Sequence, residues 1–176
     1  MTSVRDGLHN RQWQRNGYLI STNSSLIPIP RLIDVYNSSE FYWADAMPEE
    51  YMKATLQNSL CFGLFQTRES ENELLGFARC VTDYTTFLYL TDVWVDPSKQ
   101  GHGLGTWMVE CVQEVVEEMP YLRRSMLFTS SWEKSVPFYK KLMGMEVIES
   151  KYGEGLVTME RKGKGHPRYG GTGSHY

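Results

Sequence analysis

Residues 87–119 constrain the fold more than any other part of this chain. The run Phe87–Val95 is apolar, aromatic or β-branched throughout, apart from Asp92. Such a run predicts a strand that is buried on both faces and lies inside a sheet. Glycine then occupies every second position from Gly101 to Gly105, and a helical pattern begins directly after the last of them. The sequence therefore predicts a central strand, a glycine-rich turn and a helix in immediate succession.

The helix after the turn is predicted by its apolar spacing of i, i+3, i+4 and i+7, which is typical of a helix with one buried face. The apolar positions are Leu104, Trp107, Met108, Cys111, Val112, Val115, Val116 and Met119. Acidic and amide side chains occupy the other face, at Glu110, Gln113, Glu114, Glu117 and Glu118. Pro120 ends the pattern, because proline cannot continue a helix.

The turn between strand and helix has the features of an anion site. Glycine allows sharp bends and close approach of a ligand to the backbone. The first N–H groups of a helix have no partner within it, so they favour an anion such as a phosphate. The phosphate-binding motif GxxxxGK[ST] is excluded by the missing lysine, and the dinucleotide motif GxGxxG by Thr106 in the third glycine position. A glycine-rich turn without a ligand is the alternative.

The rest of the chain predicts further helices and strands. Strands are expected at 18–21, 60–65, 74–81, 125–129, 147–150 and 156–161, and helices at 29–36, from Pro48 onward, and at 135–142 with Gly144 as the C-cap. Short polar connections join the strands at 60–65, 74–81 and 87–95, which predicts a meander. Residues 1–16 are polar and expected to be loose, and so is the glycine-rich tail 163–176. One domain is expected over residues 17–162.

Two segments together resemble the GNAT superfamily of acetyltransferases. Gln-x-x-Gly-x-Gly at Gln100–Gly105 is similar to the family's acetyl-CoA motif, and Ser135–Met145 is similar to its later helix, although Met145 replaces the usual phenylalanine. The resemblance covers roughly residues 17–161. It implies an α+β fold with a mixed, mainly antiparallel sheet of about six or seven strands, flanked by helices on both faces. It also implies that the fourth and fifth strands, counted from 18–21, splay apart.

The resemblance further implies how acetyl-CoA is held. Its pantetheine arm would lie along the backbone of Val93, Trp94 and Val95. Its pyrophosphate would lie on residues of the turn and helix start: Gln100, Gly101, His102, Gly103, Leu104, Gly105 and Thr106. His102 stands where many members carry Lys or Arg, so it either donates to a phosphate or is merely exposed. Phe138 and Tyr139 of the later helix would complete the site. No metal is implied, and the histidines show no ligand spacing.

Three residues are candidates for chemistry. The backbone N–H of Val93 would polarise the thioester carbonyl, as in an oxyanion hole. Tyr139 holds the position from which the family often protonates the thiolate, and a structural role is its alternative. Many members carry a strand glutamate where this chain has Tyr89 or Thr91. Asp92, the acid inside that strand, would accept a proton, bind a cationic substrate or pair with a buried arginine such as Arg79, because a buried carboxylate needs a partner.

The acceptor is less constrained than the donor. The resemblance places substrate contacts in the segment Phe41–Met47, where Tyr42, Trp43 and Asp45 would suit a small amine with an apolar part. The two aromatic residues would otherwise belong to the core. An N-acetyltransferase acting on a small amine is the first hypothesis. A protein or peptide N-acetyltransferase and a CoA-binding protein with weak or no catalysis are the alternatives.

Composition excludes several other classes. The net charge of −3 and the absence of a basic stripe argue against nucleic acid as a partner. No apolar run is long enough to span a membrane, and the polar N-terminus lacks a signal-peptide core, which favours a cytoplasmic or nuclear protein. Cys61, Cys80 and Cys111 are far apart, so buried free thiols are expected. Dimers are common in families of this kind, so a homodimer is possible.

Overall fold

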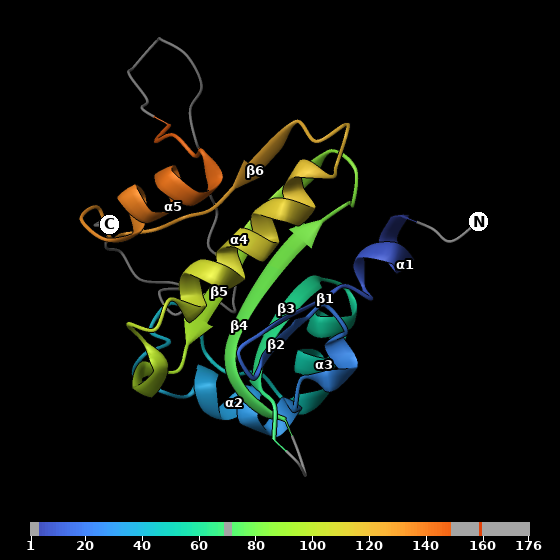
Figure 1. Cartoon of the computed structure of the whole chain (residues 1–176), viewed down its shortest axis with the longest axis vertical. Coiled ribbons are helices and arrows are strands. Elements are labelled where there is room, and N and C mark those ends of the chain that lie inside the picture. Colours follow the sequence, from blue (N-terminus) through green and yellow to red (C-terminus); the bar gives the residue numbers. More distant parts are fainter. Residues whose placement is uncertain (1–3, 69–71, 149–158, 160–176) are drawn as a thin grey trace.

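The computed structural model describes residues 4–68, 72–148 and 159 of this chain. Figure 1 shows its elements in order. They are α1 (Val4–Leu8), β1 (Gln12–Arg15), β2 (Tyr18–Ser21), the 3-10 turn Ser24–Leu26, α2 (Ile29–Tyr36), α3 (Glu49–Gln57), β3 (Leu60–Gln66), β4 (Glu73–Thr82), β5 (Phe87–Val95), the 3-10 turn Pro97–Lys99, α4 (Leu104–Glu117), β6 (Arg124–Met126) and α5 (Ser135–Met143).

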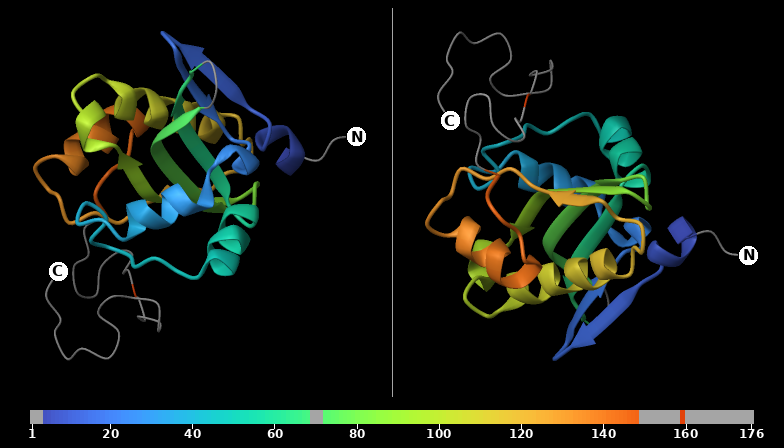
Figure 2. Two further views of the ribbon diagram at one scale, coloured as in Figure 1. Left: turned by 90° about the horizontal axis from the view of Figure 1, so that it is seen from below. Right: turned by 90° about the horizontal axis from the view of Figure 1, so that it is seen from above.

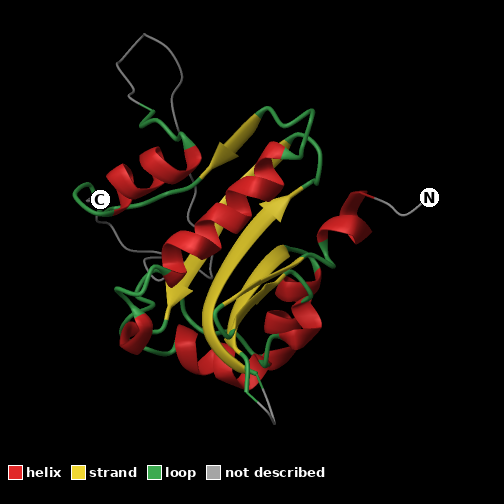
Figure 3. Cartoon of the chain, viewed as in Figure 1, coloured by secondary structure: helices red, strands yellow, loops and turns green. Residues whose placement is uncertain are grey.

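The strands form one sheet in the order β1-β2-β3-β4-β5-β6 (Figure 3). Neighbouring strands run antiparallel from β1 to β5, while β6 lies parallel to β5. The meander of β3, β4 and β5 is therefore confirmed. The mixed, mainly antiparallel sheet predicted from the sequence is confirmed as well.

Helices cover both faces of the sheet, as expected. Figure 2 shows α4 and α5 on one side and α2 and α3 on the other. Each face has its own core. Leu88 and Leu90 of β5 pack with the apolar face of α4, while Phe65 and Phe77 pack with α2 and α3. The amphipathic pattern of α4 is confirmed, because its predicted apolar residues are buried. Helix α5 ends at Gly144, which has a φ of 62° as a C-cap residue in the left-handed region.

Strand β5 is interior but is not fully buried on both faces. Its even-numbered residues from Leu88 to Trp94 are buried, whereas the residues between them are only half-buried and Phe87 is exposed. Strand β6 has only three residues and pairs with β5 only over Phe87–Tyr89. Within the described residues, β5 beyond Tyr89 therefore has a strand neighbour on the β4 side alone. This divergence is the predicted splay, and the strand expected at 125–129 is observed as Arg124–Met126.

The N-terminal segment differs from its prediction. Residues expected to be loose form α1 and β1, and β1 extends the sheet next to β2. Asn16 and Gly17, with φ values of 49° and 78°, connect the two strands. Both residues have positive φ, as a tight hairpin turn requires. Trp13 stacks on Phe62 with ring centroids 6.0 Å apart, and its indole nitrogen donates to Glu114 at 3.0 Å. The structured domain thus begins before residue 17.

The C-terminal predictions are tested only in part. Val147 and Ile148 are exposed and are not part of a strand. The remainder of the strands expected at 147–150 and 156–161, except Met159, lies outside the described residues, and so does the tail 163–176. Cys61, Cys80 and Cys111 are buried free thiols, as predicted. None of the helices in the described ranges is long and apolar enough to cross a membrane.

Candidate active site

The glycine turn joins the end of β5 to the start of α4. Gly101 and Gly103 have φ values of 82° and 75°, which side-chain-bearing residues rarely adopt. A Cβ at either position would meet nothing within 4 Å, so the space above the backbone is open. Gly103 is the N-cap of α4, and no side chain caps the helix. The amides of the first turn, which include those of Leu104 and Thr106, are therefore placed to receive an anion, so this turn fits a pyrophosphate.

Side-chain contacts hold the turn in this shape. The amide nitrogen of the Gln100 side chain donates to the carbonyl of Val95 at 3.1 Å, which closes the loop on itself. Asp96 accepts from the Ser98 backbone at 3.0 Å and pairs with Arg31 of α2 at 3.0 Å. His102 is exposed beside these contacts, and nothing described fixes its role.

Helix α4 and the end of β5 lie close together at the turn. A Cβ at Gly105 would stand 3.5 Å from Cγ2 of Val95, which is ordinary contact, whereas Leu104 is buried in the core below. The side chain of Trp94 is buried on the opposite face, with the Arg31 guanidinium 5.5 Å from its ring. The predicted pantetheine contacts at Val93–Val95 are backbone contacts, and no strand of the described part of the chain pairs with that stretch of β5 on its β6 side.

Strand β5 is irregular at Asp92 and Val93, the two strand residues that were predicted to take part in the reaction. Phe77 pairs with Trp94 and Arg79 pairs with Thr91, so Asp92 and Val93 both lie opposite the single residue Ala78. Such an extra residue is a β-bulge, which disturbs the ladder locally. Asp92 has a φ of 54°. The sequence pattern gave no sign of this bulge, since bulges depend on the register of the neighbouring strand.

Asp92 is not a free carboxylate. Its side chain is only 5% exposed, and its Oδ2 accepts from Nε of Arg79 at 2.6 Å. Nη1 of Arg79 also donates to the Ser59 hydroxyl at 3.3 Å. Of the roles considered for Asp92, the structure therefore contains the ion pair with Arg79.

Tyr139 lies on α5 and packs, half-buried, against the core beneath α4. Its ring meets Phe138 edge-on at 5.1 Å between centroids. Burial raises the pKa of the Tyr139 hydroxyl to about 12, so this group keeps its proton throughout the neutral range. A protonated hydroxyl is the state that a general acid needs.

The predicted acceptor residues are only partly brought together. Tyr42 is 72% exposed, and its hydroxyl lies 3.4 Å from the Ser130 hydroxyl, after β6. Trp43 is half-buried, and its ring is tilted against that of Phe41 with centroids 4.2 Å apart, so part of it belongs to the core. Asp45 is exposed.

Phe128 and Tyr89 were missed as candidates for the acceptor site. Phe128 is 63% exposed and lies 5.6 Å from the ring of Tyr89 on β5. No sequence motif identifies these residues. The feature that could have identified Phe128 is an aromatic residue close to the end of a predicted strand that remains exposed in the fold.

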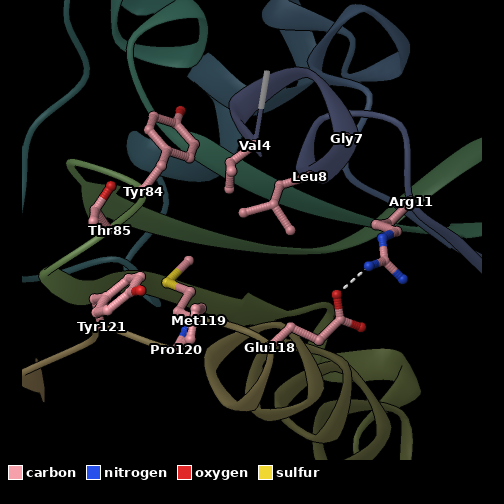
Figure 4. A pocket seen from close by; sticks show the side chains of 10 residues that line it. All are labelled: Val4, Gly7, Leu8, Arg11, Tyr84, Thr85, Glu118, Met119, Pro120 and Tyr121. Carbon is pink, nitrogen blue, oxygen red and sulfur yellow. Dashed lines mark hydrogen bonds and ion pairs between the residues drawn. The ribbon is translucent and has the colours of Figure 1, made fainter. Parts of the chain in front are cut away.

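A hollow of about 330 Å³ lies elsewhere, between α1 and the C-terminal end of α4 (Figure 4). Val4 and Leu8 line it from one side and Met119 and Tyr121 from the other, with the Arg11–Glu118 ion pair at its rim. The length of α4, about 21 Å at 1.5 Å per residue, separates this hollow from the glycine turn. It is therefore not part of the candidate active site. The described residues hold no group of three or more side chains suited to a metal ion.

Comparison with known proteins identifies the family. The model of the acetyltransferase (GNAT) family matches residues 29–145, which include β5, the glycine turn, α4 and α5. A protein of Gibberella zeae named as an acetyltransferase is 33% identical over 150 residues, covering 77% of this chain and 83% of its own length.

Solved structures agree in fold. A GNAT-family protein of Xanthomonas campestris pv. campestris has a TM-score of 0.64 and 29% identity, over 86% of this chain and 97% of its own. The ribosomal-protein-S18-alanine N-acetyltransferase of Escherichia coli has a TM-score of 0.50 and 22% identity, over 71% of this chain and 76% of its own, which shows the fold alone. With the glycine turn, the splayed β5–β6 pair and the later helix all in place, the chain belongs to the GNAT family of acetyltransferases.

Proposed function

We propose that this protein transfers the acetyl group of acetyl-CoA to the amine of a small molecule, by direct attack while both substrates are bound. The observation that carries the proposal is the alignment of three features along one path. The uncapped start of α4 suits the pyrophosphate, and the bulge at Asp92–Val93 suits the thioester carbonyl. The stretch of β5 that no described strand pairs with on the β6 side suits the pantetheine arm.

Each step then has a group of this chain assigned to it. The amides of Gly103–Thr106 hold the phosphates, and the N–H of Val93 donates to the carbonyl oxygen as negative charge develops there. The amine nitrogen forms a bond to the carbonyl carbon, and the carbon–sulfur bond breaks. Tyr139 supplies the proton that the departing sulfur takes up. The hydroxyl is protonated at neutral pH, as this role requires, although burial raises its pKa and so makes it a weaker acid than an exposed tyrosine.

The amine must lose its proton before attack, since a free alkyl amine has a pKa near ~10. Asp92 is bound by Arg79 and only 5% exposed, so it is poorly placed to accept that proton. Tyr89 and Thr91 offer no carboxylate. We therefore assign this proton to water in the gap between β5 and β6.

The acceptor class follows from the surroundings of that gap. Three aromatic residues come from different segments near it: Tyr89 and Phe128 have ring centroids 5.6 Å apart, and the Tyr42 hydroxyl lies 3.4 Å from that of Ser130. Aromatic surfaces favour a ligand with an apolar body and a limited number of polar groups. A small amine with an apolar or aromatic part is therefore favoured over a strongly charged polyamine.

The experiment is release of CoA thiol from acetyl-CoA with a panel of amines. Aryl-alkylamines are expected to accelerate release more than polyamines, amino acids or amino sugars of equal amine concentration. If peptides alone accelerate release, the protein acts on polypeptide amines instead. If acetyl-CoA binds but no amine or peptide is acetylated, the protein is a CoA-binding protein and the catalytic proposal is wrong.

A further inference from the structure

The bulge in β5 is held by a side chain of its own. Asp92 adopts a φ of 54°, in the left-handed region that residues other than glycine seldom enter. Its carboxylate turns into the layer between the sheet and α2, where it is 5% exposed. Nε of Arg79 donates to Oδ2 at 2.6 Å, and the hydroxyl of Thr91 donates to Oδ1 at 3.2 Å. The carboxylate is thus tied to the neighbouring strand and to its own.

A third group comes from the helix layer. Burial, and next to it the Asp92 charge, raise the pKa of the Tyr36 hydroxyl, which also hydrogen-bonds with that carboxylate. Arg79 in turn reaches Ser59, the buried residue before β3, through Nη1 at 3.3 Å. The network therefore joins α2, the start of β3, β4 and β5. A buried, satisfied network of this kind favours one backbone arrangement over others.

The backbone arrangement matters because amides alternate along a strand. Successive N–H groups point to opposite edges, so an extra residue reverses the direction of every amide beyond it. Asp92 and Val93 together oppose Ala78, and from Leu90 onward none of the described strands pairs with β5 on its β6 side. The bulge therefore decides which amides of Val93–Val95 face the open gap and which face β4.

We propose that the Arg79–Asp92 ion pair is a positioning device, which fixes the bulge and thereby aims the Val93 N–H at the acyl oxygen. This inference rests on the proposed acetyl transfer. Arg79 and Asp92 act through the backbone and do not touch the acceptor. The exposed fractions of the two side chains, 20% for Arg79 and 5% for Asp92, agree with this role rather than with direct contact by the carboxylate.

The test is a double-mutant cycle with Asp92→Asn, Arg79→Gln and the double variant. Each single variant leaves one buried charge unpaired and lowers stability, whereas the double variant keeps two neutral, hydrogen-bonding partners. We expect each single change to lower kcat about 10- to 100-fold. The kcat of the double variant should be at least as high as that of the less active single variant. The acetyl-CoA Kd should stay within about twofold, because the phosphate turn is untouched. The exposed Arg68–Glu73 pair, changed to Gln at both positions, is the matched control and should leave kcat unchanged.

A second measurement reports on the bulge without turnover. In 15N-valine-labelled protein, the Val93 amide resonance is expected to shift when acetyl-CoA replaces CoA in the wild type, and to lose that shift in the double variant while CoA still binds. A double variant that keeps both the Val93 shift and wild-type kcat overturns the inference.

The pH profile separates positioning from a direct role of Asp92. If Arg79→Gln is fully active while Asp92→Asn keeps only a small residual activity whose pH profile lacks the acidic limb, Asp92 acts as a base and the inference is wrong. A wild type that acetylates no amine would refute the proposed function instead. In that case the Val93 resonance of the double variant still tests whether the ion pair fixes the bulge.

Discussion

Gly103 offers the sharpest test of the phosphate turn, because Gly17 provides a matched control. The two residues have nearly the same φ, 75° and 78°, and a Cβ at either would meet nothing within 4 Å. Alanine at either position therefore introduces the same backbone strain and no clash within the protein. A left-handed conformation costs a residue with a Cβ roughly 1–2 kcal/mol. At about 2–4 °C per kcal/mol for a chain of this size, each variant should lower Tm by about 2–8 °C.

The two variants should differ in ligand binding. At Gly103 the added methyl group enters the space above the α4 amides, whereas Gly17 lies in the β1–β2 turn. Weakening one hydrogen bond to a charged phosphate costs about 1.5–3 kcal/mol, or roughly 10- to 150-fold in affinity. We therefore expect Gly103→Ala to raise the acetyl-CoA Kd by that factor, and Gly17→Ala to leave it within about twofold.

Calorimetric titration with acetyl-CoA measures the affinities, and thermal unfolding without ligand measures the strain. Unchanged affinity in Gly103→Ala, or an equal loss in both variants, would refute the assignment of the turn. Equal losses of Tm with unequal losses of affinity are the predicted pattern.

Three further predictions concern other elements. Tyr139→Phe should lower kcat with little change in the acetyl-CoA Kd, and an unaltered kcat would exclude the Tyr139 hydroxyl as the acid. Burial raises the pKa of this hydroxyl to about 12, so the wild type should lose stability as the pH rises from about 10 toward 12. The Phe variant should lose less stability over the same range. Trp13→Ala removes the stacking on Phe62 and the hydrogen bond to Glu114, and should lower the unfolding free energy by about 2 kcal/mol in denaturant titration while CoA binding persists. Tyr42→Ala, at a 72% exposed position, should raise the acceptor KM in steady-state assays without changing Tm, and a KM equal to that of the wild type would remove Tyr42 from the acceptor site.

The sequence by itself determined the strand, the glycine turn and the helix to which we assign the donor. The run Phe87–Val95, the alternate glycines and the apolar spacing of α4 are local patterns, and the structure has each element where its pattern lies. Local patterns suffice here because strand, turn and helix follow one another directly. The dipeptide Asn16-Gly17 is a sequence signal for the β1–β2 hairpin, because both residues accept the positive φ of such a turn. The expectation that residues 1–16 are loose overlooked this signal.

Only the tertiary structure decided the bulge, the ion pair and the acceptor side. Asp92 could have been a base, a ligand for a cation or a partner of Arg79, and the choice depended on the register between β4 and β5, which aligns Arg79 with Thr91. Tyr89 and Phe128 meet because β6 is short and the chain leaves the sheet after Met126. Contacts between residues far apart in sequence depend on pairing register and on how far a strand extends, and one chain's local pattern does not specify either quantity. The physical reason is that a pattern of apolar residues selects a face, whereas register selects a neighbour.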